Sequence, residues 1–141
     1  MFTFPSKEWV DAFVEKLNSS PDFAEAGENW EGDIVFIIEA DENCPRTCCV
    51  YLDLFKGKCR KYEYLEKCEE TTTPRSEFKY KGPYRNWVKL INKEIDPIQG
   101  IITGKFNLEG PLMEIIKYRK AAKEIVNIAA TIETDVQNRK V

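Results

Sequence analysis

The chain has 141 residues, of which 43% are hydrophobic and 32% charged, and its formal net charge is −3. This composition is typical of one globular domain, and charges of both signs are interspersed, whereas a nucleic-acid-binding surface needs a concentrated basic face. Because the chain contains no histidine, the usual general base, the commonest metal ligand and every Ser–His or Cys–His mechanism are excluded.

Residues 1–27 predict two helices. Ser6 is a suitable N-cap for the first helix, and Pro21 suits the first position of a shorter second helix that Gly27 ends. After Ser6 the apolar residues recur at helical spacing. They predict a buried stripe of Trp9, Val10, Phe13, Val14 and Leu17.

Three strands should follow. The middle of the first strand, Trp30–Ala40, is apolar on both faces, which predicts a central strand that is covered on both sides. A partner subunit is one candidate for the second cover. Thr47–Phe55 alternates as a second strand, and a tight hairpin at Lys56–Lys58 leads to a third strand, Cys59–Cys68. This third strand is more polar and should lie near an edge, and Glu69–Arg75 should form a loop.

The central stretch of the chain predicts a strand, two helices and another strand. Phe78 and Tyr80 point to one face of a strand that Gly82-Pro83 should break. A helix follows on the apolar spacing of Tyr84, Trp87, Val88 and Ile91.

The second of these helices should begin at Asp96-Pro97, because Asp accepts the free N–H groups of a first turn. Ile98, Ile101 and Ile102 are its expected apolar face, and Gly104 can supply a left-handed stop. Lys105–Glu109 then alternates as the last strand.

From Pro111 the pattern predicts helix almost to the end, and Arg119 and Lys120 are compatible with a bend. The expected apolar stripe consists of Ile115, Tyr118, Ala122, Ile125, Ala129 and Ile132. Residues 139–141 should fray.

The five cysteines do not have the paired spacing of a zinc site. They are Cys44, Cys48, Cys49, Cys59 and Cys68. An odd number in a chain without an evident export signal favours buried, reduced thiols, with a disulfide between Cys44 and a neighbour as the alternative. We expect no catalytic residue, no metal and no cofactor, and an enzyme that uses the thiols is the least favoured function.

Several features, taken in order along nearly the whole chain, resemble the sterol carrier protein (type 2) domain family of small intracellular lipid carriers. The features are Trp30-Glu31-Gly32-Asp33 entering an apolar strand, the Phe55-Lys56-Gly57-Lys58 hairpin, the aromatic-bearing helix, Asp96-Pro97, and a strand with Gly104, Lys105, Phe106, Leu108 and Gly110.

This resemblance implies an α+β fold with a five-stranded, mostly antiparallel sheet. The predicted strands would have the spatial order 3-2-1-4-5, with helices on one face, in a single sterol-carrier-like lipid-binding domain over residues 1–141. In that family, equivalent segments wall an apolar tunnel. The implied function is therefore non-covalent binding or transfer of a fatty acyl chain, a sterol or an isoprenoid lipid. The implied ligand-binding residues are Phe78, Tyr80, Trp87, Ile91, Ile98, Ile101, Ile102, Phe106, Leu108 and Ile116.

Periodicity alone favours a solid core built from these residues, and it is the resemblance that favours a tunnel. The alternative function is an interaction or dimerisation module that uses the C-terminal helix without a ligand. The longest apolar run, Ile34–Ile38, is too short to cross a bilayer, and the N-terminus shows no signal-peptide pattern. We therefore expect a non-enzymatic, cytoplasmic lipid carrier, a possible homodimer, with no nucleic acid partner and no stable membrane insertion.

Overall fold

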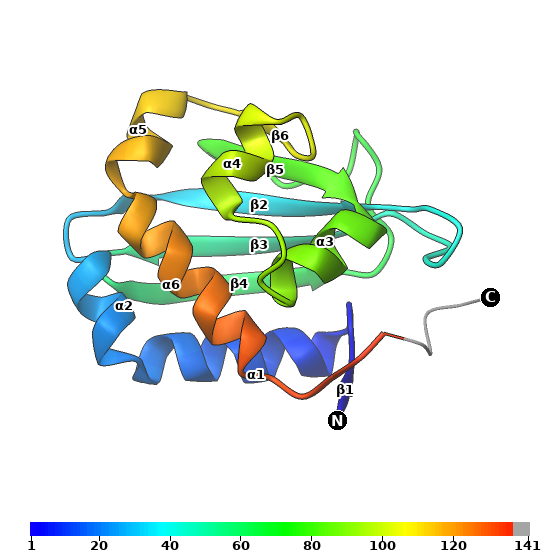
Figure 1. The fold of residues 1–141 in the computed structure, drawn as a ribbon, viewed down its shortest axis with the longest axis horizontal. Helices are drawn as coiled ribbons and strands as arrows, with labels where there is room; N and C mark the ends of the chain where they lie inside the picture. The colour runs from blue at the N-terminus through cyan, green and yellow to red at the C-terminus, as the bar shows by residue number, and fades with distance from the viewer. Residues whose placement is uncertain (137–141) are drawn as a thin grey trace.

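The computed structural model describes residues 1–136, in which helices pack across one face of a five-stranded sheet (Figure 1). The elements in chain order are β1 (Phe2–Thr3), α1 (Lys7–Ser19), α2 (Pro21–Ala26), β2 (Glu31–Glu39), β3 (Cys48–Phe55), β4 (Lys58–Leu65), β5 (Phe78–Pro83), α3 (Tyr84–Ile91), α4 (Pro97–Ile102), β6 (Asn107–Glu109), α5 (Leu112–Lys117), α6 (Arg119–Ala130) and β7 (Thr134–Asp135). No helix in residues 1–136 is long and apolar enough to span a bilayer.

Side-chain caps begin the helices where the sequence predicts them. The Ser6 hydroxyl accepts a hydrogen bond from the Trp9 backbone N–H at 3.1 Å, and Ser20 caps α2 in the same way. The Asp96 carboxylate accepts from two backbone N–H groups of α4. All five residues of the predicted α1 stripe are buried. The predicted starts of these three helices and the buried stripe of α1 are therefore confirmed.

The large sheet has the order β4-β3-β2-β5-β6. Neighbouring strands are antiparallel except for β2 and β5, which are parallel. The order corresponds to the implied 3-2-1-4-5. Between β3 and β4 the hairpin turns at Lys56 and Gly57, both with positive φ. A side chain at Gly57 would meet the Ala24 carbonyl, because α2 lies directly against this turn.

The face of the sheet opposite the helices is covered by the chain itself. Val35 and Ile37 are buried there in a small cluster with Cys49 and Cys68. Cys68 lies in the connection between β4 and β5, where its backbone N–H donates to the Thr47 carbonyl at 2.8 Å. Burial of this face therefore does not require the partner subunit considered above.

A disulfide joins Cys49 to Cys68. The expectation of reduced thiols is wrong for these two residues, and the pair is not the one suggested for Cys44. The sequence could not show it because the contact depends on how the β4–β5 connection folds back over the sheet. Cys44, Cys48 and Cys59 are buried, reduced thiols, as expected.

The C-terminal region is two helices rather than one long helix. The chain bends at Tyr118 between α5 and α6, directly before Arg119 and Lys120, where the sequence is compatible with a bend. Helix α6 then ends at Ala130. The helix does not continue, because the backbone of 133–135 pairs with the N-terminus instead. The Phe2 N–H donates to the Glu133 carbonyl at 3.0 Å, and β7 forms a parallel pair with β1. Residues 139–141, expected to fray, lie outside the described part.

The disulfide gives a stability prediction. The two cysteines are 19 residues apart. Closing a loop of this length lowers the conformational entropy of the unfolded chain and so raises its free energy by about 3 kcal/mol. Cys68→Ser should lower the free energy of unfolding by about this amount in a urea titration under oxidising conditions. The wild type should lose the same amount when a reductant is added, and Cys68→Ser should no longer respond to it.

Cys59→Ser is the matched control, since it changes a buried thiol that is not in the disulfide. This variant should keep the full response to reductant. Equal unfolding curves of the wild type with and without reductant would show that the bridge does not stabilise the fold.

Candidate functional site

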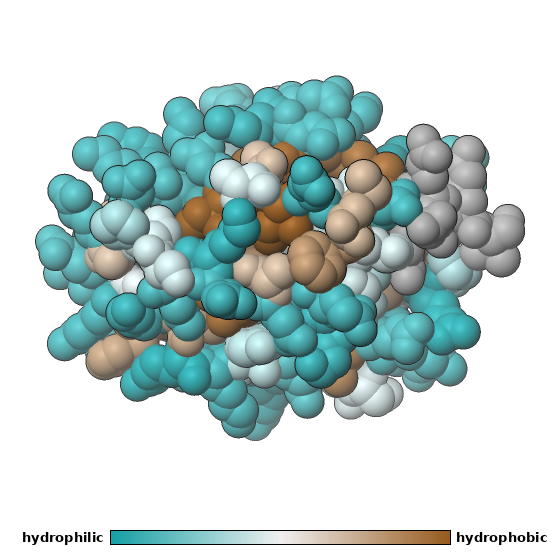
Figure 2. Space-filling view, turned by 90° about the horizontal axis from the view of Figure 1, so that it is seen from below, coloured by the Kyte–Doolittle hydropathy of each residue, from teal (hydrophilic) through white to brown (hydrophobic). Residues whose placement is uncertain are grey.

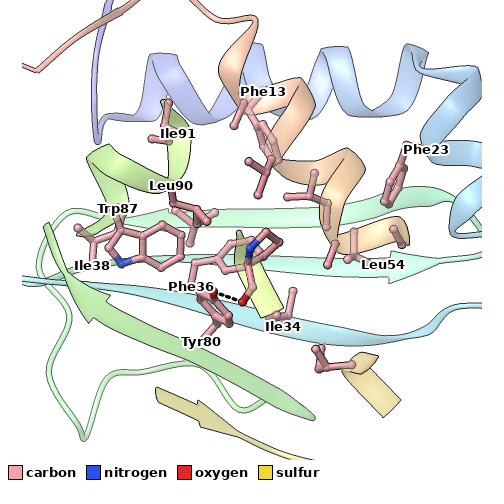
Figure 3. Close-up of a pocket in the computed structure, with 18 of the residues that line it drawn as sticks. Phe13, Phe23, Ile34, Phe36, Ile38, Leu54, Tyr80, Trp87, Leu90 and Ile91 are labelled. Carbon is pink, nitrogen blue, oxygen red and sulfur yellow. Dashed lines mark hydrogen bonds between the residues drawn. The ribbon is translucent and has the colours of Figure 1, made fainter. Parts of the chain in front are cut away.

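A cavity lies between the helix-covered face of the sheet and the helices themselves (Figure 3). It offers about 100 Å³ to the centres of water-sized molecules, and the total empty space, including the part that opens to solvent, is about 980 Å³. The lining side chains come from α1 to α6, β2, β3 and β5 and from the segments just before α1 and β2, and all of them are aliphatic, aromatic or proline. The cavity is therefore built by the whole fold rather than by one motif.

The floor of the cavity is the central strand. Ile34, Phe36 and Ile38 of β2 point from the sheet toward the helices (Figure 3). Ile34 and Ile38 are 5% and 1% exposed, but Phe36 between them is only half-buried. A half-buried phenylalanine in the middle of a central, helix-covered strand shows that the space above it is not filled by side chains.

The roof is α6, which presents small side chains to the sheet. Ala121, Ala122 and Ala129 line the cavity together with Ile125 and Val126. Protein interiors are normally packed to crystal-like density. Alanines opposite the strand leave volume that longer side chains would fill. Figure 2 shows hydrophobic atoms in a hollow among hydrophilic side chains on the face seen from below, so the apolar interior is not fully closed there.

The polar atoms of the aromatic wall are all paired away from the cavity. The Tyr80 hydroxyl donates to the Pro97 carbonyl at 2.7 Å, as drawn in Figure 3. The Trp87 indole N–H donates to the carbonyls of Ile37 and Gly82 at 3.0 and 3.1 Å. Burial raises the pKa of Tyr80, with a smaller effect of the Asp96 charge, so its hydroxyl stays a neutral donor.

The indole N–H groups of Trp9 and Trp30 are also paired away from the cavity. They donate to the Thr134 hydroxyl and the Gly32 carbonyl at 2.9 and 3.0 Å, respectively. The wall therefore presents carbon to the cavity. A polar group that entered would lose its hydrogen bonds with water and find no partner in the wall, which is costly. The geometry suits an apolar occupant.

Four of the ten ligand-binding residues implied by the resemblance line this cavity: Tyr80, Trp87, Ile91 and Ile98. The remaining six do not. They are Phe78, Ile101, Ile102, Phe106, Leu108 and Ile116.

Phe106 supports the wall from outside. Its ring packs on Tyr80 and Trp87 with ring centroids 4.7 and 5.1 Å apart. A Cβ built on Gly82 or Gly100 would come within 2.5 or 2.9 Å of the Phe106 ring. The two glycines therefore allow the ring to sit directly behind the wall, where it fixes the position of Tyr80 and Trp87.

The expected apolar face of α4 is only partly correct. Ile98 reaches the cavity, but Ile102 is 62% exposed, and the buried residues of this helix are Pro97 and Gly100. The helix has six residues, and Gly100 is the position that lies against Phe106. This close approach turns Ile102 toward solvent.

Phe36 and the alanines of α6 line the cavity but are not among the ligand-binding residues predicted from the sequence. The predicted C-terminal stripe did contain Ala122, Ile125 and Ala129. The available signal was the small size of these alanines at positions that face a sheet, which indicates unfilled volume rather than tight packing.

The described residues provide little reactive chemistry near the cavity. Burial raises the pKa of Cys59 to about 11, so this thiol is protonated at neutral pH. Within residues 1–136, no three Cys, Asp or Glu side chains lie close enough together to hold a metal ion.

Tyr80 gives a prediction for the wall. Tyr80→Phe removes a buried hydrogen bond to the Pro97 carbonyl, so the free energy of unfolding should fall by about 0.5–1.5 kcal/mol at neutral pH. The folded-state pKa of Tyr80 lies above its ordinary value of 10.0, so its contribution is constant below pH 10 and is lost as the unfolded chain ionises above it. Stability should therefore fall less steeply above pH 10 in Tyr80→Phe than in the wild type, as measured by urea unfolding across this range.

Tyr62→Phe is the control at neutral pH, because the Tyr62 hydroxyl donates to Asp11 at the exposed surface. This change should cost little, since water can replace the lost bond. Equal costs for the two variants would mean that the Tyr80 bond is not a buried constraint.

The chain matches no protein-family model and no curated protein. Its structure is similar to several solved ones. The crystal structure of a sterol carrier protein 2 has 24% identity and a TM-score of 0.81, with 91% of this chain and 98% of that chain covered. A solution structure from Thermus thermophilus, of a conserved hypothetical protein described as possibly a sterol carrier protein, has 23% identity and a TM-score of 0.82, with 96% and 93% covered.

The apo form of sterol carrier protein 2 from Yarrowia lipolytica is also similar, at 19% identity and a TM-score of 0.57, with 94% of this chain and 97% of that chain covered. The chain therefore has the α+β fold of sterol carrier protein 2, which confirms at the level of the fold the resemblance found in its sequence.

Proposed function

We propose that the protein binds a long apolar molecule without covalent chemistry in the cavity between sheet and helices. The observation that carries this proposal is the hollow above Phe36, whose aromatic wall has its hydroxyl and indole groups paired elsewhere. The similarity in fold supports this proposal, because the similar structures are named sterol carrier protein 2.

The energy of such binding is sufficient. Burying about fifteen methylenes releases roughly 12 kcal/mol at ~0.8 kcal/mol each. Association costs about 4–15 kcal/mol, so a micromolar or somewhat tighter affinity follows. The cavity offers about 100 Å³ to the centres of water-sized molecules, so a long ligand would have to be thin or would have to widen the space between sheet and helices. Its narrow interior favours a flexible fatty acyl chain over a rigid sterol or a branched isoprenoid.

The proposed contact residues are the wall and roof of this cavity: Phe36, Tyr80, Trp87, Ile98 and Ala122. None of them offers a free polar group to the interior, so a polar head group should remain at the opening. Recognition then depends on the length and shape of the apolar part. Selectivity among lipids with similar chains should be loose.

We propose a carrier rather than an enzyme. Among the described residues that line the cavity, Tyr80 is the one that titrates, and its hydroxyl already donates to Pro97. No side chain in the wall is placed to act as an acid, a base or a nucleophile on a bound lipid.

The alternative of a dimerisation module has less support. The apolar residues of α6 are used within the chain, with Ala121, Val126, Ile128 and Ala129 all buried. This helix also packs against α1, α2, α3, α4 and α5. The width of its apolar face therefore reflects contacts with its own domain.

Filling the cavity tests the proposal. Ala122 of α6 lines the same cavity as Phe36 and is partly exposed. In Ala122→Trp the indole should occupy the hollow, so binding of a fluorescent long-chain fatty acid should fall by at least tenfold while the thermal midpoint is kept or raised. In a solid core the same change would cost ~1–3 kcal/mol through overpacking.

Ala130→Trp is the matched control, because Ala130 belongs to the same helix but is exposed. It should bind the fatty acid as the wild type does. In the wild type, affinity should rise with chain length until the cavity is full. No saturable binding by the wild type, together with a clear loss of stability in Ala122→Trp, would refute the carrier function.

A further inference from the structure

Large apolar side chains are exposed at the end of α4 and the start of α5. Ile102 is 62% exposed, Leu112 41% and Met113 74%. Together with Met1, Phe2 and Tyr62 they are the exposed large hydrophobic residues of the described part. Ile102 is the last residue of α4, and Leu112 and Met113 are the first two of α5. We call these three residues the α4–α5 tip.

The segment that carries the tip is basic in an acidic protein. Residues 101–123 contain five basic side chains and two acidic ones, a net charge of +3, whereas the whole chain has −3. All seven of these side chains are exposed: Lys105, Glu109, Glu114, Lys117, Arg119, Lys120 and Lys123. The rest of the chain therefore carries −6, so this segment has the opposite net charge to the remainder of the protein.

We propose that the α4–α5 tip docks on the surface of an anionic phospholipid bilayer. Exposed methionine, leucine and isoleucine side chains can enter the boundary between head groups and acyl chains. Basic residues near an anionic membrane surface are attracted to its head groups, and each one adds to the free energy of binding. The combination of apolar tip and basic surroundings meets both requirements, and a peripheral contact needs no membrane-spanning helix.

A second copy of the chain fits this surface less well. A twofold dimer would place the same basic segment of both copies against itself. Like charges facing one another across an interface oppose association. An anionic lipid surface has the complementary charge instead.

The role that we assign to this docking rests on the proposed function. Ile98 of α4 and Ile115 of α5 line the cavity, so the two helices that carry the tip also border the space proposed for the lipid. Both helices pack on α6, the roof. Docking would hold the cavity close to the bilayer from which an apolar ligand is taken or to which it is delivered.

The test is sedimentation of the full chain with phosphatidylcholine vesicles, with and without phosphatidylserine. The wild type should bind the vesicles that contain phosphatidylserine, and less so as salt is raised, because the attraction is screened. Met113→Glu removes an apolar anchor and Lys120→Glu reverses a charge, so each should weaken vesicle binding by about tenfold or more. Both positions are exposed, so the fold should be kept.

Thr71→Glu is the matched control. It adds the same charge as Met113→Glu at an exposed position in the connection between β4 and β5, and it should bind vesicles as the wild type does. Binding of a fluorescent fatty acid in solution without vesicles should be the same in all four proteins. If the wild type docks on vesicles but binds no fatty acid, the docking surface stands and the carrier function falls.

Two results would overturn the docking surface. One is a wild type that does not prefer vesicles with phosphatidylserine, or variants that bind them as well as the wild type. The other is a dimer, measured by light scattering, that Met113→Glu dissociates, since the tip would then be the contact between two copies.

Discussion

The structure depends on one constraint, which is that the polar atoms of a large aromatic wall must find partners without facing the cavity. The Tyr80 hydroxyl and the Trp87 indole N–H satisfy it by donating to backbone carbonyls at 2.7–3.1 Å. These bonds also join β5 to the start of α4, and α3 to the sheet. An apolar cavity whose wall offers no partner to water stays dry. The same hydrogen bonds thus support the fold and leave the hollow free of water.

Leaving a hollow has an energetic cost, since the atoms that line it lose the dispersion contacts of a packed core. The surrounding structure is correspondingly well packed. Phe106 is held between Gly82 and Gly100 behind the wall. On the other face of the sheet, Val35 and Cys49 are fully buried beneath a connection that the disulfide ties down.

Much of the fold could be predicted because its signals are local. Helix caps such as Ser6 and Asp96 act on backbone groups two or three residues away, and strand alternation shows which side chains share a face. The strand order required the family resemblance, since alternation does not say which strands are neighbours. The disulfide was missed for a related reason: Cys49 and Cys68 meet only because a long connection crosses the sheet.

The cavity shows a deeper limit of sequence patterns. Apolar periodicity identifies the inward face of an element, but a side chain that faces inward can meet another side chain or empty space. Ile98, on a helical stripe, and Phe106, in an alternating strand, are both expected to face inward, yet one lines the hollow and the other is packed behind its wall. Which outcome holds depends on the height of the roof above the floor, and that height is set by distant parts of the chain.

The position of α6 shows how this height is determined. At its N-terminal end, the Tyr118 hydroxyl donates to the Asn29 carbonyl at 2.9 Å. Beyond its C-terminal end, β7 pairs with β1, and the Thr134 hydroxyl accepts from the Trp9 indole at 2.9 Å. The helix is thus held at both ends by residues more than 80 positions away in the sequence. Between these anchors it can present alanines to the sheet without closing the gap, and so the connections at the ends of α6 maintain the hollow above Phe36.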